Sequence, residues 1–316
     1  MLKYFIIIII FFFSGCKEES QLFTKKNDTL KNRDSIRVTS KTSSETSKYA
    51  VSKYFTPVLN SPDFNSVYGG KNGSTLKRSN NGLIKELEYV AYPGSVFEIL
   101  SEIKKEDHKI YRVKTDEYEI PELGIELFID SRFIGLTDFK PEKRKINLPS
   151  KNEIFEYLDK SVGAMYVWGA NNLDGVPQMF EYYAPKGNPG ESEKKEWMMK
   201  GLDCSGLLYE ATNGYTARNT HQLVYIGESV KISGLTAGQI ASKVKPLDLI
   251  VWKGHIILVY DENTTIESSF SAGEVIKKNI IDVLNKLISK RKPVDEWTGG
   301  KKNEFVIRRW FNENTK

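Results

Sequence analysis

The residue in this chain best suited to covalent chemistry is a cysteine at the start of a predicted helix. Cys204 lies in the stretch "LDCSGLLYEATNG", where apolar residues recur at helical spacing after the cysteine. Unpaired N–H groups and the helix dipole favour a thiolate at such a position, and the thiolate is the nucleophilic form of cysteine. The alternative is a buried structural thiol, because free cysteines are among the most buried residues.

A thiolate nucleophile needs a nearby base, and the chain supplies one downstream. The stretches "DLIVW" and "HIILVYD" predict two β-strands joined by the turn Lys253-Gly254, so that His255 begins the second strand. Glu267, in "TIESS", would lie on the next strand, where its carboxylate could hold one imidazole nitrogen and leave the other for Cys204. This ordered set of a cysteine, a histidine and a glutamate predicts nucleophilic hydrolysis.

The two remaining histidines indicate no second site. His221 lies in the irregular segment "ARNTHQL" and is the rival base, whereas His108 lies in the charged turn "KEDHKIY", where we expect it to be solvated. The three histidines are too widely spaced to form a zinc site, and the sequence has no glycine-rich loop for phosphate. We therefore expect neither a metal nor a cofactor.

The stretches "YVWGA", "LDCSG", "KPLDLIVWKGHIILVY" and "TIES" resemble the NlpC/P60 cell-wall endopeptidases, a branch of the papain-like cysteine hydrolases. The resemblance covers roughly residues 150–316 and implies an α+β catalytic domain. In that domain Cys204 is the nucleophile, His255 is the base and Glu267 orients the imidazole. The chain departs from the family pattern at two positions: Glu267 stands where histidine is common, and Leu247 stands at the glycine of "GDL".

The resemblance also implies residues that contact the substrate. Tyr166 in "YVWG" matches a tyrosine that lines the cleft, while Asp203 and Ser205 match residues that hold the free amino end of a substrate peptide in some members. The structural alternatives are that Tyr166 packs in the core and that Asp203 caps the helix. Arg218 lies in a segment that resembles the family's "R-x-[ST]" motif and is expected to support the fold.

The N-terminal segment "MLKYFIIIIIFFFSGC" has the pattern of a secretory signal. Its apolar run is too short to span a membrane, and its end resembles the lipobox of bacterial lipoproteins. We therefore predict a signal peptide over residues 1–15 and a lipid on Cys16 that anchors the protein to a membrane. The alternative is an uncleaved signal anchor. If Cys16 carries lipid, Cys204 has no partner for a disulfide within the chain.

The rest of the chain divides into three predicted parts. Residues 16–50 are polar and are predicted to form a flexible tether. Residues 51–147 alternate short β-like runs with polar turns, which predicts a small all-β barrel, and the run "GSVFEILSE...YRVKT...LFIDSRFI" resembles a bacterial SH3-like domain. After the linker "FKPEKRKINLPS", residues 148–316 would form the catalytic domain.

Within the catalytic domain, periodicity predicts a helix in "NEIFEYLDKSVGAM", with Ser150 or Asn152 as its N-cap, and a second helix in "VLNKLISK". A final strand is predicted in "EFVIRRW". The connection 171–200 is longer than expected. Its aromatic half, "MFEYY", could wall the cleft, and its charged half is expected to be solvated.

These features together predict a peptidoglycan hydrolase, a cysteine endopeptidase that cleaves stem peptides. The resemblance implies the γ-D-glutamyl–diamino-acid bond as its target. The alternative is a non-catalytic, wall-binding lipoprotein that keeps the hydrolase fold, suggested by Glu267 and by the long connection. An amidase or acyltransferase on the same fold is a third possibility.

Charge and anchoring bound the partners and the location. The formal net charge of +5 is small and scattered, which argues against a nucleic-acid partner. We expect a monomer held by its lipid on a bacterial membrane, the outer membrane, and facing the periplasm or the cell surface.

Overall fold

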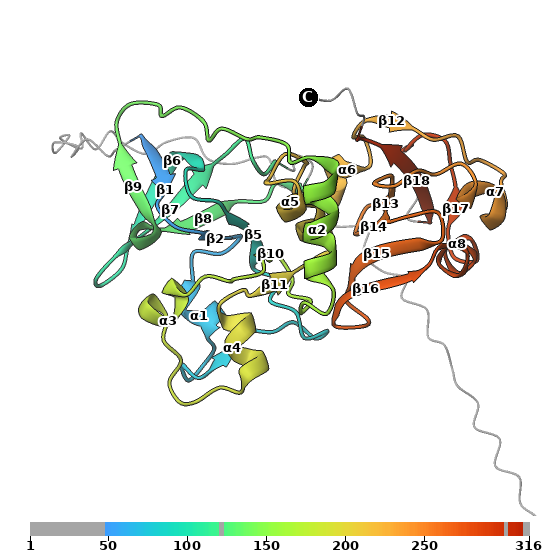
Figure 1. The fold of residues 1–316 in the computed structure, drawn as a ribbon. Coiled ribbons are helices and arrows are strands. Elements are labelled where there is room, and N and C mark those ends of the chain that lie inside the picture. Colours follow the sequence, from blue (N-terminus) through green and yellow to red (C-terminus); the bar gives the residue numbers. More distant parts are fainter. Residues whose placement is uncertain (1–47, 120–122, 300–302, 312–316) are drawn as a thin grey trace, which may run out of the picture. The chain divides into compact units, whose positions relative to one another are not determined.

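The computed structural model describes residues 48–119, 123–299 and 303–311 (Figure 1). The predicted signal peptide, Cys16 and the tether up to residue 47 lie outside the described residues. Each helix in the described part of the chain is too short or too polar to span a membrane.

An antiparallel sheet of seven strands forms the first part of the described chain. Its strand order is β5-β2-β8-β7-β6-β1-β9. The strands are β1 (Tyr49–Ser52), β2 (Thr56–Leu59), β5 (Leu87–Ala91), β6 (Val96–Lys104), β7 (Lys109–Lys114), β8 (Leu127–Asp130) and β9 (Ile134–Thr137). The short strands are as predicted, but among the described residues the pairing does not close into a barrel, so the closed barrel is not confirmed.

A side chain from the later part of the chain occupies the open edge of β5. At this edge the backbone N–H of Val90 donates to Oδ1 of Asn171, and Nδ2 of Asn171 donates back to the carbonyl of Val90. A side chain from the later part of the chain thus occupies the backbone groups that a further strand would otherwise need.

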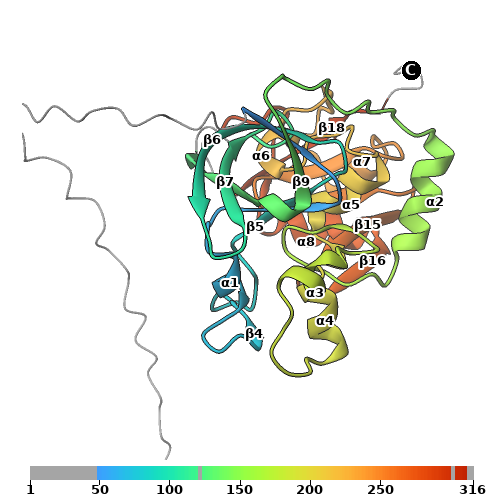
Figure 2. The ribbon, with the colours of Figure 1, turned by 90° about the vertical axis from the view of Figure 1, so that its left-hand side faces the viewer.

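The long connection 171–200 folds against this first sheet. It contains β10 (Asn171–Asn172), α3 (Gln178–Tyr182) and α4 (Glu191–Trp197), which β11 (Gly201–Leu202) follows. Beside it lie α1 (Phe64–Val67), β3 (Tyr68–Gly69) and β4 (Thr75–Leu76), and α1, α3 and α4 gather at one end of the sheet in both views (Figures 1 and 2).

The aromatic half of this connection is part of a hydrophobic core. Tyr183 and the fully buried Trp197 pack in the core of the first sheet, and Nε1 of Trp197 donates to the carbonyl of Tyr183 at 2.7 Å. The solvated position predicted for His108 is wrong, because this side chain also packs against the long connection. Its side chain is only 5% exposed, and its ring meets the ring of Tyr183 edge-on, beside η2 (Ser131–Phe133).

A second, mostly antiparallel sheet forms the rest of the chain. Its order is β12-β18-β13-β14-β15-β16, and β17 pairs in parallel with β18. The strands are β12 (Glu228–Ser229), β13 (Leu249–Trp252), β14 (His255–Val259), β15 (Thr264–Ser269), β16 (Glu274–Asn279), β17 (Lys292–Pro293) and β18 (Glu304–Arg309). The predicted hairpin is confirmed, with Trp252 opposite His255, and so is the final strand.

Successive residues of the strands point to opposite faces of the second sheet. Both faces carry apolar residues, and helices cover both of them. On one face Leu249 and Val251 pack with α2 (Lys151–Ser161), α5 (Cys204–Ala211) and α6 (Thr220–Leu223). On the other face Ile250 packs with α7 (Ala237–Ala241) and α8 (Ile280–Ile288) (Figure 1). The fold is therefore mixed α/β.

The two predicted N-caps of α2 are now distinguished. Ser150 is the cap: its Oγ accepts from the backbone N–H of Glu153, whose carboxylate accepts in return from the N–H of Ser150. This capping box satisfies two N–H groups that the first turn leaves unpaired.

Leu247, which replaces the glycine of the family motif, keeps the backbone conformation that glycine favours. Its φ is +73°, in the left-handed region, which costs a side chain roughly 1–2 kcal/mol. Its N–H donates to the carbonyl of Val259 and its own carbonyl accepts from Nε1 of Trp310 at 2.8 Å, while its side chain is fully buried. Burial and these two hydrogen bonds hold the strained residue at the entrance to β13.

Candidate active site

The N-terminus of α5 is fixed by the residue before the cysteine. Asp203 has an extended backbone, and its Oδ1 accepts from the N–H of Gly206 at 2.6 Å, so the predicted alternative of a helix cap is correct. A Cβ on Gly206 would lie 2.2 Å from the carbonyl oxygen of Ala170. Only glycine therefore allows this helix to begin so close to the segment before β10.

Cys204 occupies the first position of α5, as predicted, and is a free thiol that is 8% exposed. The imidazole of His255, on β14, lies close enough to Cys204 for the sulfur to raise the pKa of the ring. Tyr166 lies close enough to Cys204 and Asp203 for their charges to act on its phenol. The structure thus brings together the cysteine, the histidine and the tyrosine that the sequence selected.

His255 also contacts Glu267 directly. Its Nε2 lies 2.6 Å from Oε2 of Glu267, which is on β15 and has a side chain 8% exposed. Because Nε2 is engaged by the carboxylate, Nδ1 is the nitrogen left for Cys204. This order of contacts, sulfur to imidazole to carboxylate, is the arrangement that a nucleophile, its base and an orienting group require.

The surroundings of His255 keep its ring protonated at neutral pH. Burial lowers the pKa of His255. The interactions of the ring with Cys204 and Glu267, and the charges of both groups, raise the pKa by more than burial lowers it, to about 10. A protonated imidazole beside the sulfur favours the thiolate form of a cysteine.

Lys278 is a member of this site that the sequence reasoning missed. Its Nζ lies 2.8 Å from Oε1 of Glu267, so the two carboxylate oxygens are shared between an imidazole and an ammonium. Burial raises the pKa of Glu267, but its bonds to His255 and Lys278 lower it more strongly. Glu267 faces Ile276 across the β15–β16 ladder, which places Lys278 diagonally opposite on the same face. This placement follows from strand alternation only once the register is known.

Tyr166 lies beside the cysteine and is held there by a backbone hydrogen bond and a ring contact. Its N–H donates to the carbonyl of Gly273, and its ring meets that of Phe270 edge-on at 5.6 Å. Burial, followed by the charges of Asp203 and Cys204, raises the pKa of the Tyr166 phenol, so it stays a neutral hydrogen-bond donor.

Asp203 and Ser205 belong to a buried network around Arg218. The guanidinium is 2% exposed and donates from Nη1 and Nη2 to the two oxygens of Asp203, at 3.0 and 2.8 Å. Nη1 also donates to Oγ of Ser205. Both carboxylate oxygens of Asp203 thus already accept hydrogen bonds from other groups of the protein. The predicted role of Asp203 and Ser205 in binding a substrate amine stays a prediction.

The remaining donors of Arg218 connect this network to the first sheet. Nε donates to Oδ1 of Asn171 at 3.0 Å, and Nη2 donates to the carbonyl of Ala170. Asn171 is the residue that pairs with Val90 at the edge of β5. All five N–H groups of Arg218 therefore have acceptors. Arg218 supports the fold, as expected, whereas Asn171 carried no sequence signal beyond its place at the start of the long connection.

His221, the rival base, lies on α6, and the imidazole placed against Cys204 is that of His255. Among the residues that the structure describes, no group of histidine, cysteine and acidic side chains could hold a metal ion.

NlpC/P60 proteins are among the solved structures that this chain resembles. NlpC1 from Trichomonas vaginalis is 13% identical, and the match covers 85% of this chain and 70% of that one, with a TM-score of 0.31. The peptidoglycan hydrolase RipB from Mycobacterium tuberculosis is 20% identical over 52% of this chain and 69% of its own, with a TM-score of 0.30.

RipD from Mycobacterium tuberculosis, a non-catalytic NlpC/p60 domain protein adapted to peptidoglycan binding, is 14% identical over 51% of this chain and 96% of its own, with a TM-score of 0.31. No protein-family model matches the sequence, and no curated protein does. The family predicted from the sequence is also the family of the matched structures. At these identities and TM-scores, the matched structures do not indicate the function of this chain, and the evidence for it comes from the chain's own residues.

Replacing Glu267 by glutamine should lower the pKa of His255 from about 10. Glutamine keeps the size of the side chain but removes the negative charge that favours the imidazolium. An NMR titration of the His255 ring measures the change. Glu262→Gln, in the exposed turn before β15, is the control and should leave the value unchanged. An unaltered His255 titration in Glu267→Gln would contradict the assigned contact.

Replacing Arg218 by methionine should destabilise the protein by about 3–5 kcal/mol, because it leaves the buried carboxylate of Asp203 without its partner. Urea unfolding measures this loss. Arg112→Met is the matched control, since the ion pair of Arg112 with Glu126 is partly exposed and should contribute about 0–1 kcal/mol. Equal losses in the two variants would count against the role given to Arg218.

Proposed function

We propose that this chain is a cysteine hydrolase that cleaves amide bonds in peptidoglycan stem peptides. The observation that carries the proposal is the position of the His255 imidazole, beside Cys204 on one side and 2.6 Å from Glu267 on the other. The NlpC/P60-like sequence stretches supply the substrate class. On the same ground we propose the γ-D-glutamyl–diamino-acid bond as the target.

The chemistry follows from the order of the contacts. The Cys204 thiolate attacks the amide carbonyl, and a carbon–sulfur bond forms as the carbonyl oxygen becomes an oxyanion, which the backbone N–H at the start of α5 would help to hold. Nδ1–H of His255 then gives its proton to the leaving amine as the carbon–nitrogen bond breaks. Water, deprotonated by His255, hydrolyses the thioester and restores the thiolate.

The remaining predictions from the sequence complete this proposal. Lipid on Cys16 would hold the enzyme on a bacterial membrane, the outer membrane, and a tether from residue 16 to about 50 would let it reach the wall. The first sheet would act as an SH3-like domain ahead of a papain-like catalytic domain, and the protein would act as a monomer.

One observation favours a second function, a wall-binding lipoprotein without catalysis. Cys204 is only 8% exposed, so access of a substrate carbonyl to the sulfur is narrow. In this alternative the hydrolase fold is kept as a scaffold for binding peptidoglycan. The two functions differ in whether the sulfur reacts.

Incubation of the purified protein with muropeptides should give cleaved stem peptides detectable by mass spectrometry. Cys204→Ala should reduce the rate by a factor of about 1,000 or more, since it removes the nucleophile. Glu262→Gln, away from the site, should cleave like the parent. Cleavage by Cys204→Ala at the parent's rate would refute the mechanism. The identity of the products separates an endopeptidase from an amidase or an acyltransferase.

Alkylation of Cys204 by iodoacetamide across pH separates the two functions without a substrate. An accessible Cys204 beside the His255 imidazole should be alkylated at pH 7, and His255→Ala should be alkylated more slowly at the same pH. A parent protein that reacts only from about pH 8.5 would favour the scaffold.

A further inference from the structure

The two residues that flank Asn219 bind on opposite sides of the candidate active site. Arg218 pairs with Asp203, the residue immediately before the nucleophile. Thr220 is bound to Gly254, the residue immediately before the base. One short segment thus reaches both the helix that carries the sulfur and the hairpin that carries the imidazole.

Thr220 makes its contact from a helix that is firmly packed. Its hydroxyl accepts a hydrogen bond from the backbone N–H of Gly254 at 2.8 Å. Thr220 is the first residue of α6 and is 7% exposed. Leu223, on the same helix, is fully buried in the core on one face of the second sheet. Close packing of that core fixes the position of α6, and therefore that of the hydroxyl.

The turn that donates this hydrogen bond determines where the imidazole lies. Trp252 and His255 face each other at the end of the β13–β14 ladder, so only Lys253 and Gly254 lie between the two strands. Gly254 is exposed and has a φ of +109°. No atom beyond its two neighbours lies within 4 Å of the position that a Cβ would take. Packing around Gly254 is therefore sparse, and the hydrogen bond to Thr220 fixes the turn.

The other end of the segment is held just as firmly. The guanidinium of Arg218 is 2% exposed and makes five hydrogen bonds within the protein. The backbone of Asn219, between the two anchoring residues, is extended, with φ −124° and ψ 153°. Residues two positions apart in an extended chain lie about 7 Å from each other. The segment therefore acts as a spacer of fixed length between the start of α5 and the β13–β14 turn.

We propose that Thr220 is a positioning residue of the hydrolytic site, which holds the β13–β14 turn through Gly254 and thereby keeps the His255 imidazole beside Cys204. Arg218 holds the opposite end of the same spacer. The effect on catalysis rests on the proposed function, since a displacement of about 1 Å can slow a reaction about 100-fold. The positioning itself requires no substrate.

Thr220→Val tests this role, because valine has a similar shape but lacks the hydroxyl. Cys204 and Glu267 raise the pKa of His255 to about 10, so a ring that moves away from Cys204 should titrate at a lower pH. An NMR titration of the His255 ring in the absence of substrate measures this shift. Thr220→Ser keeps the hydroxyl and should titrate like the parent.

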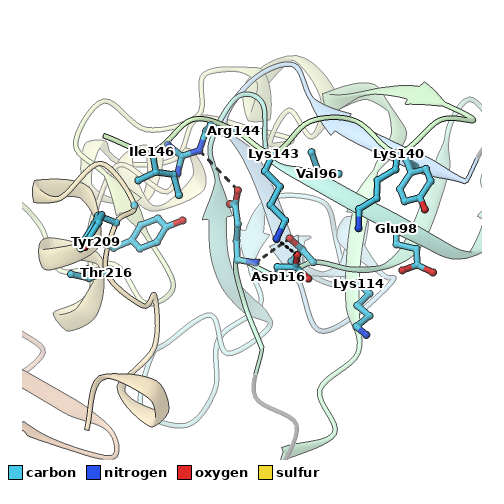
Figure 3. A pocket seen from close by; sticks show the side chains of 15 residues that line it. Val96, Glu98, Lys114, Asp116, Lys140, Lys143, Arg144, Ile146, Tyr209 and Thr216 are labelled. Carbon is cyan, nitrogen blue, oxygen red and sulfur yellow. Dashed lines mark hydrogen bonds and ion pairs between the residues drawn. The ribbon is translucent and has the colours of Figure 1, made fainter. Parts of the chain in front are cut away.

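Thr216→Val is the matched control. Thr216 is also buried, at 3% exposed, and its hydroxyl lies 3.0 Å from that of Thr212. It lines a cavity at the other end of α5, together with Tyr209 (Figure 3). Loss of this hydroxyl should lower the free energy of unfolding but leave the titration of His255 unchanged. An unchanged titration in Thr220→Val, or an equal change in Thr216→Val, would overturn the proposal.

Cleavage of muropeptides gives a second measurement. Thr220→Val should lower kcat about tenfold with KM nearly unchanged, because positioning acts on the reacting groups rather than on binding. Thr220→Ser should restore most of the rate. A raised KM at the parent's kcat would contradict the role given to Thr220. If the parent itself cleaves no muropeptide, the proposed function fails, whereas the NMR titration still decides whether Thr220 holds His255.

Discussion

Arg218 and Asp203 form a buried ion pair that determines where α5 begins and therefore where the sulfur of Cys204 lies. Taking two charges out of water costs several kcal/mol, and their attraction offsets this only when the remaining donors and acceptors are also satisfied. Here every N–H of the guanidinium has an acceptor, and the carboxylate also caps the helix. The same carboxylate accepts from the N–H of Gly169, which fixes the segment that follows Tyr166. One ion pair thus sets the backbone on both sides of the nucleophile.

In the proposed mechanism, the charge of the Cys204 thiolate also controls when His255 gives up its proton. A group whose pKa is near 10 is a poor acid at neutral pH. Part of that high value comes from the charge of Cys204, and this charge is lost when the sulfur bonds to a carbonyl carbon. The pKa of His255 should then fall just when the leaving amine needs a proton. Glu267 does not lose its charge, but its carboxylate binds both His255 and Lys278.

Much of this site could be predicted from the sequence because its parts are local. A capping acid before a helix, a tight hairpin and strand alternation each depend on a few neighbouring residues, and these placed Cys204, His255 and Glu267 on the elements that carry them. Lys278 and Asn171 could not be found this way, because their roles depend on a strand register and on a contact between distant segments. His108 was misjudged for the same reason, since a charged local sequence does not show what will later pack against it.

The pairing of Asn171 with Val90 has a consequence for how this protein can come apart. The hydrophobic core of the first sheet includes Val176 and Trp197, which lie well beyond the linker, so the core does not end where the sequence suggests a domain boundary. Opening of β5 would remove the partners of Asn171 and then disturb the acceptor of Arg218. The edge of the first sheet and the start of α5 should therefore unfold together, as one cooperative unit. Such local unfolding would displace Cys204 from His255 before the second sheet came apart.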